Sequence, residues 1–279
     1  MKVVFWGVRG STPSPGESTV RYGGNTSCME LRLGGGELVI CDAGTGIRPL
    51  GLKLLREGEG EPTKGYIFFS HFHWDHIQGF PFFRPAFVKG NEFTLIGAPP
   101  GDETIQEILV RQMNSVNFPV NFEYLSADFH YQPVSNNVSM EIGATHVRFI
   151  EVNHTSRCAA VRFEEKGKTL VYMTDNELER SSPTPFRNFV NFCNGADVLI
   201  HDAQYTPETY GGHEGWGHSS WKSVIRLAME AGVKRLYLYH HDPESDDSEV
   251  DEILVRAKSS AGDRGLEIFA AHERMEISI

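Results

Sequence analysis

The sequence is short of positive charge. Among 279 residues, 26 Lys and Arg stand against 37 Asp and Glu, which leaves a formal net charge of −11. A chain this acidic has no general electrostatic attraction for a nucleic-acid backbone, so binding of that kind would require a local basic patch.

Long apolar runs are missing as well. The apolar start, Val3 to Val8, is shorter than the ~7–15 apolar residues of a secretory signal with its cleavage site, and no run approaches the ~20 residues that span a bilayer. We therefore expect a soluble, cytoplasmic protein with no membrane partner. The 40% hydrophobic content is ample for a packed core and excludes a disordered chain.

Cysteine is scarce and scattered. The four cysteines, Cys28, Cys41, Cys158 and Cys193, form no C-x-x-C pair. This spacing argues against a cysteine zinc site or a disulfide framework. We interpret them as small core side chains.

Short β-branched runs alternate with helical stretches along the whole chain, which predicts an α/β fold. No low-complexity linker interrupts the pattern, so we expect a single domain over residues 1–279. Ionisable residues follow several apolar strands directly, as in Cys41-Asp42 and Tyr239-His240. Sheets with parallel strands place ligand sites at such strand ends.

The most informative segment runs from Ser70 to His76. It brings His71, His73, Asp75 and His76 together directly after the apolar strand predicted at Tyr66–Phe69. Imidazole and carboxylate are ordinary zinc ligands, and four such donors can serve more than one ion. A histidine-rich surface loop is the alternative, but few arrangements satisfy four clustered donors without a metal.

This H-x-H-x-D-H run resembles the signature of the metallo-β-lactamase superfamily. The resemblance extends over essentially the whole chain, through Asp42, His154, Asp175 and His240, each at or near a strand end. It implies an α/β fold, namely an αββα four-layer sandwich, with two divalent metal ions at one edge. Zinc is the expected metal, with manganese or iron as alternatives.

The resemblance also implies a division of ligands. One ion would be held by His71, His73 and His154, the other by Asp75, His76 and His240, with Asp175 as the bridge. His240 and His241 compete for the last position, and because neighbouring side chains on a strand point to opposite faces, only one can reach the metal. The family pattern favours His240, which leaves His241, like Asp42, to support the ligands from behind.

Two further segments resemble the tRNase Z and cyclic phosphodiesterase branch of the superfamily. They are Leu199-Ile200-His201-Asp202-Ala203 and Gly217-His218-Ser219-Ser220. The resemblance implies that Asp202 orients His218 and that His218 donates a proton to the leaving oxygen. Asp202 stands where the branch has a glutamate. Asp75 is expected to take part in catalysis as well as in metal binding.

The predicted function is hydrolysis of small phosphodiesters, cyclic nucleotide or ribose phosphodiesters among them. Hydrolysis of a carboxylic ester, lactone or thioester, or a non-catalytic metal-bound sensor, are the alternatives. The tRNA-processing members carry a protruding arm between the third-motif histidine and the bridging aspartate. Here only residues 155–174 separate His154 from Asp175, so we expect no tRNA partner; a homodimer is left open.

Overall fold

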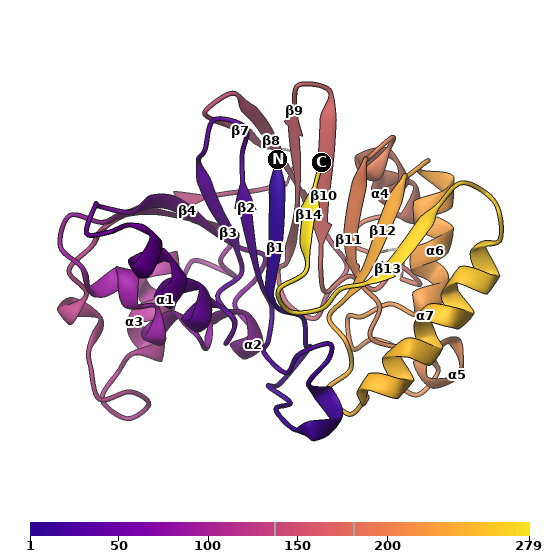
Figure 1. Cartoon of the computed structure of the whole chain (residues 1–279), viewed down its shortest axis with the longest axis horizontal. Helices are drawn as coiled ribbons and strands as arrows, with labels where there is room; N and C mark the ends of the chain where they lie inside the picture. The colour runs from indigo at the N-terminus through magenta and orange to yellow at the C-terminus, as the bar shows by residue number, and fades with distance from the viewer. Residues whose placement is uncertain (137, 181) are drawn as a thin grey trace.

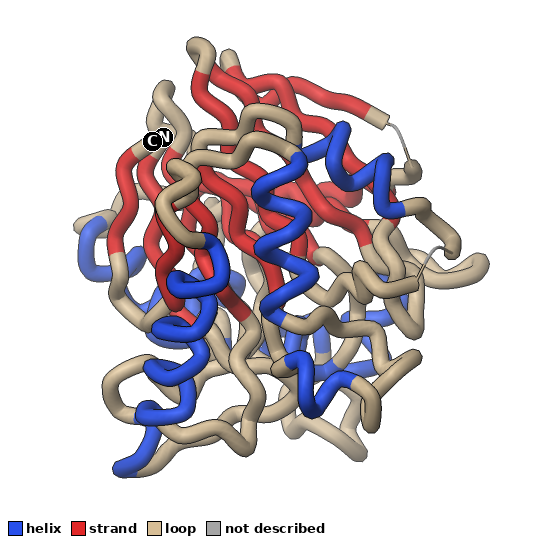
Figure 2. Tube along the Cα trace, turned by 90° about the vertical axis from the view of Figure 1, so that its right-hand side faces the viewer, coloured by secondary structure: helices blue, strands red, loops and turns tan. Residues whose placement is uncertain are grey.

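Two β-sheets lie face to face, and helices cover the outer face of each (Figure 1). The computed structural model describes residues 1–136, 138–180 and 182–279, and within these ranges each sheet has seven strands. The arrangement confirms the predicted αββα sandwich. Figure 2 shows helices running across the strands that they cover.

The first sheet has the strand order β14-β1-β2-β3-β4-β5-β6. Its strands are β1 (Lys2–Gly7), β2 (Cys28–Arg32), β3 (Leu38–Cys41), β4 (Lys64–Phe69), β5 (Glu92–Gly97), β6 (Asp128–Pro133) and β14 (Glu276–Ser278). Strands β3 to β6 are parallel, whereas β2 and β3 form an antiparallel hairpin. The helices on this side are α1 (Ile47–Glu57), the single-turn α2 (Trp74–Ile77) and α3 (Ile105–Gln112).

The second sheet has the order β13-β12-β11-β10-β9-β8-β7. Its strands are β7 (Ser139–Ile142), β8 (Thr145–Glu151), β9 (Ala159–Glu165), β10 (Lys168–Met173), β11 (Val198–Asp202), β12 (Arg235–Tyr239) and β13 (Glu267–Ala270). Strands β10 to β13 are parallel. The helices on this side are α4 (Phe186–Cys193), the single-turn α5 (Pro207–Tyr210), α6 (Trp221–Glu230) and α7 (Asp247–Ala261).

Apolar side chains fill all three layers between these elements. Phe5, Phe68 and Phe163 belong to the cluster between the two sheets, and further clusters lie between each sheet and its helices. Helix α6 buries an apolar stripe that includes Val224 and Ala228. No helix in the described ranges is long and apolar enough to cross a membrane. Because β3, β4 and β5 in one sheet and β10, β11 and β12 in the other are parallel, each set presents its carboxyl ends along one edge.

Candidate metal centre

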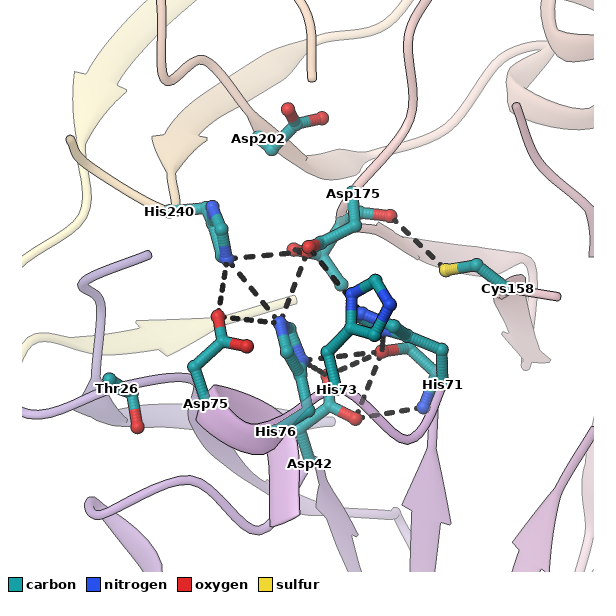
Figure 3. Close-up of polar contacts among 12 residues, drawn as sticks. Thr26, Asp42, His71, His73, Asp75, His76, Cys158, Asp175, Asp202 and His240 are labelled. Atoms are coloured by element: carbon teal, nitrogen blue, oxygen red, sulfur yellow. Dashed lines mark hydrogen bonds and ion pairs between the residues drawn. The ribbon is translucent and has the colours of Figure 1, made fainter. Parts of the chain in front are cut away.

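Three side chains of the centre leave their strands from an unusual backbone conformation. Asp42 follows β3, Asp175 lies two residues beyond β10, and His240 follows β12, with φ angles of 62°, 52° and 57°. Residues other than glycine rarely adopt positive φ, and such conformations concentrate at functional sites. The turn sends each side chain towards the space between the two sheets (Figure 3).

The first cluster consists of His71, His73 and His154. The first two come from the turn between β4 and α2, and His154 comes from the loop after β8. One nitrogen from each ring lies within 4.8 Å of the others, and His73 Nδ1 is 3.0 Å from His154 Nε2. The strand-to-helix turn therefore brings together donors that are two and 83 residues apart.

The second cluster consists of Asp75, His76, Asp175 and His240, all of them buried. His240 Nε2 lies 3.1 Å from Asp75 Oδ2, and His76 Nε2 lies 3.3 Å from Asp175 Oδ1 (Figure 3). The other oxygen of Asp175 faces the first cluster, 3.7 Å from His71 Nε2. The Asp175 carboxylate thus lies between the two clusters, where it can contact an ion in either.

Hydrogen bonds on the far side of the rings fix which nitrogen faces the centre. His76 Nδ1 donates to Asp42 Oδ2 over 2.9 Å, and His240 Nδ1 donates to the Gln204 side-chain oxygen over 3.0 Å. Because a neutral imidazole carries a single N–H, both rings keep the lone pair of Nε2 for the centre. This is the second layer of contacts that orients metal-binding histidines.

The first cluster has the same design. His154 Nδ1 donates to the carbonyl of Gly217 over 2.9 Å, and His71 Nδ1 lies 3.1 Å from the Ser70 hydroxyl. The Nε2 atom of His71 is buried and has no hydrogen-bond partner among the residues that the structure describes. A buried nitrogen without a partner costs free energy, and a metal ion would remove that cost.

The electrostatics of His71, His154 and Asp175 favour the protonation states that metal binding requires. Burial lowers the pKa of His71 well below its usual range and lowers that of His154 to about 4, so both are neutral at pH 7. Burial works against the charged form of Asp175, but the histidines around it, His240 first, hold its pKa well below the usual range. His76 differs: burial opposes its charged form, but the nearby carboxylates, Asp175 first, raise its pKa well above the usual range, so a metal ion would displace a proton from it. Neutral imidazoles and ionised carboxylates are the forms that bind divalent ions. The cluster is suited to two divalent metal ions.

Asp202 and His218 meet beside these clusters. His218 Nδ1 lies 3.4 Å from Asp202 Oδ2 and 3.9 Å from Asp175 Oδ2. Burial opposes the charged form of Asp202, but the imidazoles of His201 and His218 beside it outweigh this effect and lower its pKa to about 2. Burial likewise opposes the charged form of His218, but Asp202 and then Asp175 raise its pKa. The pair can therefore hold a proton on His218.

A cavity of about 680 Å³ opens beside His218. Its wall includes Ser11 and Gln204 on the side of the metal centre and Tyr205 and Trp216 farther out. Its volume is in the range of small-molecule sites. A substrate group bound there would lie against the imidazole of His218.

His241 does not support the ligands as its sequence position suggested. Its Nε2 donates to the carbonyl of Ala271 over 2.8 Å, and its ring packs edge-on to Tyr22, on the side away from the clusters. The alternation along β12 continues into these two residues, so His240 faces the centre and His241 faces α7 and β13. Asp42, by contrast, bonds directly to the ring of His76.

Three contributors were not found from the sequence. Gln204 orients His240, the Gly217 carbonyl orients His154, and Glu177 accepts hydrogen bonds from the Gly215 and Gly217 amides. Glycine is required at position 217, because its φ is 89° and any side chain there would overlap the His154 ring. The glycine next to His218 was the available sequence signal.

A family comparison bears on this arrangement. Residues 38–241 match the family described as "Beta-lactamase superfamily domain", a stretch that includes every residue of both clusters. The chain belongs to the beta-lactamase superfamily. As a member of it with the full donor set in place, the protein is a metal-dependent hydrolase.

Relatives within the superfamily point to one branch. The ribonuclease Z of Picrophilus torridus is 22% identical, and the alignment covers 100% of this chain and 96% of that protein. Human tRNase Z, short form, has the same fold, with a TM-score of 0.68 at 21% identity over 100% and 99% of the two chains. A diphosphatase from the PhnP family has a TM-score of 0.69 at 19% identity over 100% and 97%. These superfamily relatives confirm the resemblance to the tRNase Z and phosphodiesterase branch.

The same comparison overturns the expectation that tRNA is not a partner. Full-length relatives in the superfamily are ribonuclease Z enzymes, and a second one, from Methanosarcina mazei, is 25% identical over 86% of this chain and 87% of its own. The expectation rested on a missing insertion and on net charge. Net charge averages over the whole surface and does not exclude a local RNA-binding face, and a missing arm removes only one means of holding RNA.

Proposed function

We propose that the protein hydrolyses phosphodiesters, both in RNA and in small molecules, at a pair of zinc ions. His71, His73 and His154 would hold one ion, Asp75, His76 and His240 the other, and Asp175 would bridge them. Manganese and iron have the same ligand preferences and are the alternatives for the metal. The observation that carries the proposal is the Asp202–His218 pair next to the clusters.

The two ions would supply a water acidic enough to ionise near neutral pH and positive charge against the phosphate oxygens. The protein's side chains would hold the two ions and orient the histidine rings that bind them. Gln204 and Asp42 fix the rings of His240 and His76, and Asp175 keeps both clusters at one spacing. Asp75 Oδ2 lies 3.1 Å from His240 Nε2, so both donor atoms face the second metal position.

His218 is the proposed general acid. A phosphodiester with an alcohol leaving group needs a proton on the departing oxygen, and a positioned histidine supplies it. Asp202, a buried carboxylate at 3.4 Å, favours the protonated imidazole. Hydrolysis of a carbonyl ester at the same centre has less need of such a donor, which is why phosphodiesters are the better match.

The substrate range is proposed from one relative and from the cavity beside His218. The Picrophilus torridus relative is a ribonuclease Z, which favours RNA. The cavity of about 680 Å³ beside His218 also has room for the leaving group of a small diester. Assays with precursor tRNA, cyclic nucleotides, bis-p-nitrophenyl phosphate and a lactone panel separate these classes.

The decisive variant is His218→Ala. We expect it to keep near-normal metal content and to lose roughly 10²–10⁴-fold in kcat for diesters with poor alcohol leaving groups. The loss should be small with bis-p-nitrophenyl phosphate, because nitrophenolate leaves without a proton. Metal analysis and kcat on both kinds of substrate test this.

His146→Ala is a matched control, since His146 pairs with Glu141 on the surface far along β8. It should change neither measurement. Equal losses on good and poor leaving groups would remove His218 from the acid role. Loss of metal would instead make His218 a ligand beside His154 and Asp175, with which it also forms a compact group.

A further inference from the structure

Three aromatic rings line the outer part of the cavity beside His218. Tyr205 stacks on His213, with ring centroids 4.4 Å apart and planes 18° apart. His213 in turn meets the Trp216 ring edge-on at 4.9 Å. All three line the cavity. They form a continuous aromatic wall, defined here as Tyr205, His213 and Trp216.

The inner and outer ends of the aromatic wall differ in exposure. Tyr205 is 2% exposed and meets the His218 ring edge-on at 6.0 Å, whereas Trp216 is 60% exposed. An exposed indole offers a large flat apolar face, and flat aromatic ligands stack on it. The aromatic wall therefore leads from the proposed acid to a ring with a face open to a ligand.

Another part of the cavity lining is acidic. Glu249, Glu252 and Ile253 line it from the first turns of α7, which lies at the same end of the molecule as α5 (Figure 1). Arg256 also lines the cavity, and it is already bonded to Glu208 over 2.5 Å. Such a side repels an anionic ring and accepts hydrogen bonds from N–H and O–H groups.

From these features we infer that the cavity binds the nucleobase of the leaving nucleoside, stacked on Trp216, with its polar edge towards α7. The inference rests on the proposed function, since it assigns the group whose oxygen His218 would protonate. A nucleobase is flat and uncharged, and it carries the N–H donors that the carboxylates accept. The cavity volume suits one nucleoside.

The test compares two substrates in which hydrolysis cleaves the same bond, between the phosphate and the ribose 3′-oxygen. Adenosine 3′-(methyl phosphate) and the same diester without the base both yield methyl phosphate and a ribose 3′-hydroxyl on hydrolysis. The metal-loaded wild type should have the higher kcat/KM on the base-bearing diester. Trp216→Ala should reduce this preference by about 5- to 100-fold, the range for loss of one stacked base. Because the preference is a ratio within one protein sample, partial misfolding cancels.

Trp216→Phe should retain most of the preference, since it keeps an aromatic face. Tyr124→Ala removes another exposed aromatic ring, one that does not line the cavity, and should leave the ratio unchanged. Equal kcat/KM on the two diesters in the wild type, or the same ratio in Trp216→Ala, would overturn the inference. If bis-p-nitrophenyl phosphate is cleaved but the base-bearing diester is not, the inference fails alone. If no diester is cleaved, the proposed function fails first.

Discussion

The tautomer and ring orientation of four histidines in the centre depend on the group that contacts the ring nitrogen facing away from the clusters. The partners are of four kinds: the hydroxyl of Ser70, the carboxylate of Asp42, the carbonyl of Gly217 and the amide oxygen of Gln204. Each one fixes a tautomer and a ring angle. Residues that bind no metal themselves therefore determine how well the metal is bound.

Gln204 offers the clearest test of this dependence. Gln204→Leu removes the acceptor for His240 Nδ1 at similar side-chain size, so the ring is free to turn and to change tautomer. We expect the affinity of the second metal position to fall by roughly 10- to 100-fold, measured by titration against a competing chelator. Gln204→Glu keeps an acceptor in place and should stay close to the wild type. Equal affinity in the leucine variant would mean that the ring is held by other contacts.

The lowered pKa of His241 predicts that the free energy of unfolding depends on pH. Burial lowers its pKa to about 4 in the folded protein, below the ordinary value of about 6.5. The unfolded chain therefore binds a proton that the folded chain does not, and stability is lost as the pH falls from about 6.5 towards 4. Between pH 7.5 and pH 5, the titration of His241 should lower the free energy of unfolding by roughly 2 kcal/mol.

His241→Gln keeps a donor for the Ala271 carbonyl and removes the titration. Urea unfolding of both proteins at the two pH values gives the free energies of unfolding. The variant should lose less stability on acidification, and the difference between the proteins cancels the titration of all other groups. A wild type and variant that lose the same free energy would contradict the assignment.

At the scale of elements, one buried carboxylate holds the segment that carries both a ligand partner and the proposed acid. Glu177 accepts from the Tyr210 hydroxyl and from the amides of Gly215 and Gly217. These contacts set the position of residues 210–217, which end directly before His218. The segment has no regular secondary structure beyond α5, so its geometry depends on this anchor.

Glu177→Ala should release that segment. Two backbone amides and a hydroxyl lose their acceptor, and the Gly217 carbonyl is no longer fixed against His154. We expect hydrogen exchange in residues 211–219 to rise by about 10-fold or more, with a loss of similar size in kcat. Glu214→Ala makes the same change on an exposed part of the segment and should alter neither. Unchanged exchange in the Glu177 variant would show that other contacts hold the segment.

The sequence predicted the interior strands of both sheets but only one of the four edge strands, β13. The predicted strands matched the central ones closely, since apolar, β-branched runs such as β11 carry a strong signal. The missed strands were β6, β7 and β14, each at the edge of a sheet. Edge strands carry polar or short sequences, as in the half-exposed β6. Their pairing depends on the neighbouring strand, which a local pattern cannot contain.

The residues of the site also fall into those that the sequence predicted and those that it did not. The donors from His71 to His76 were recognisable because they are local and follow one strand. Gln204 and Glu177 were not, because an isolated Gln or Glu in a loop has no distinctive pattern and acts on a residue 36 or 40 positions away. What remains hidden in the sequence is the layer of contacts that the fold brings together.

On the scale of the whole molecule, the centre joins the two sheets. His71 to His76 belong to the first sheet and its turn, whereas His154, Asp175 and His240 come from the second. Apart from the centre, the sheets are held by the apolar layer between them. Bound metal would therefore stabilise the association of the two sheets as well as each turn.

Removal of metal should accordingly lower the stability of the whole fold. A ligand present at 1,000 times its Kd contributes about 4 kcal/mol, which corresponds to a fall in Tm on the order of 10 °C on treatment with a chelator. Addition of zinc should restore it. His73→Ala, which removes one donor of the first cluster, should have a lower Tm and a smaller response to the chelator. Calorimetry with parallel metal analysis checks both, and an unchanged Tm in a sample verified to be free of metal would mean that the apolar layer alone holds the two sheets together.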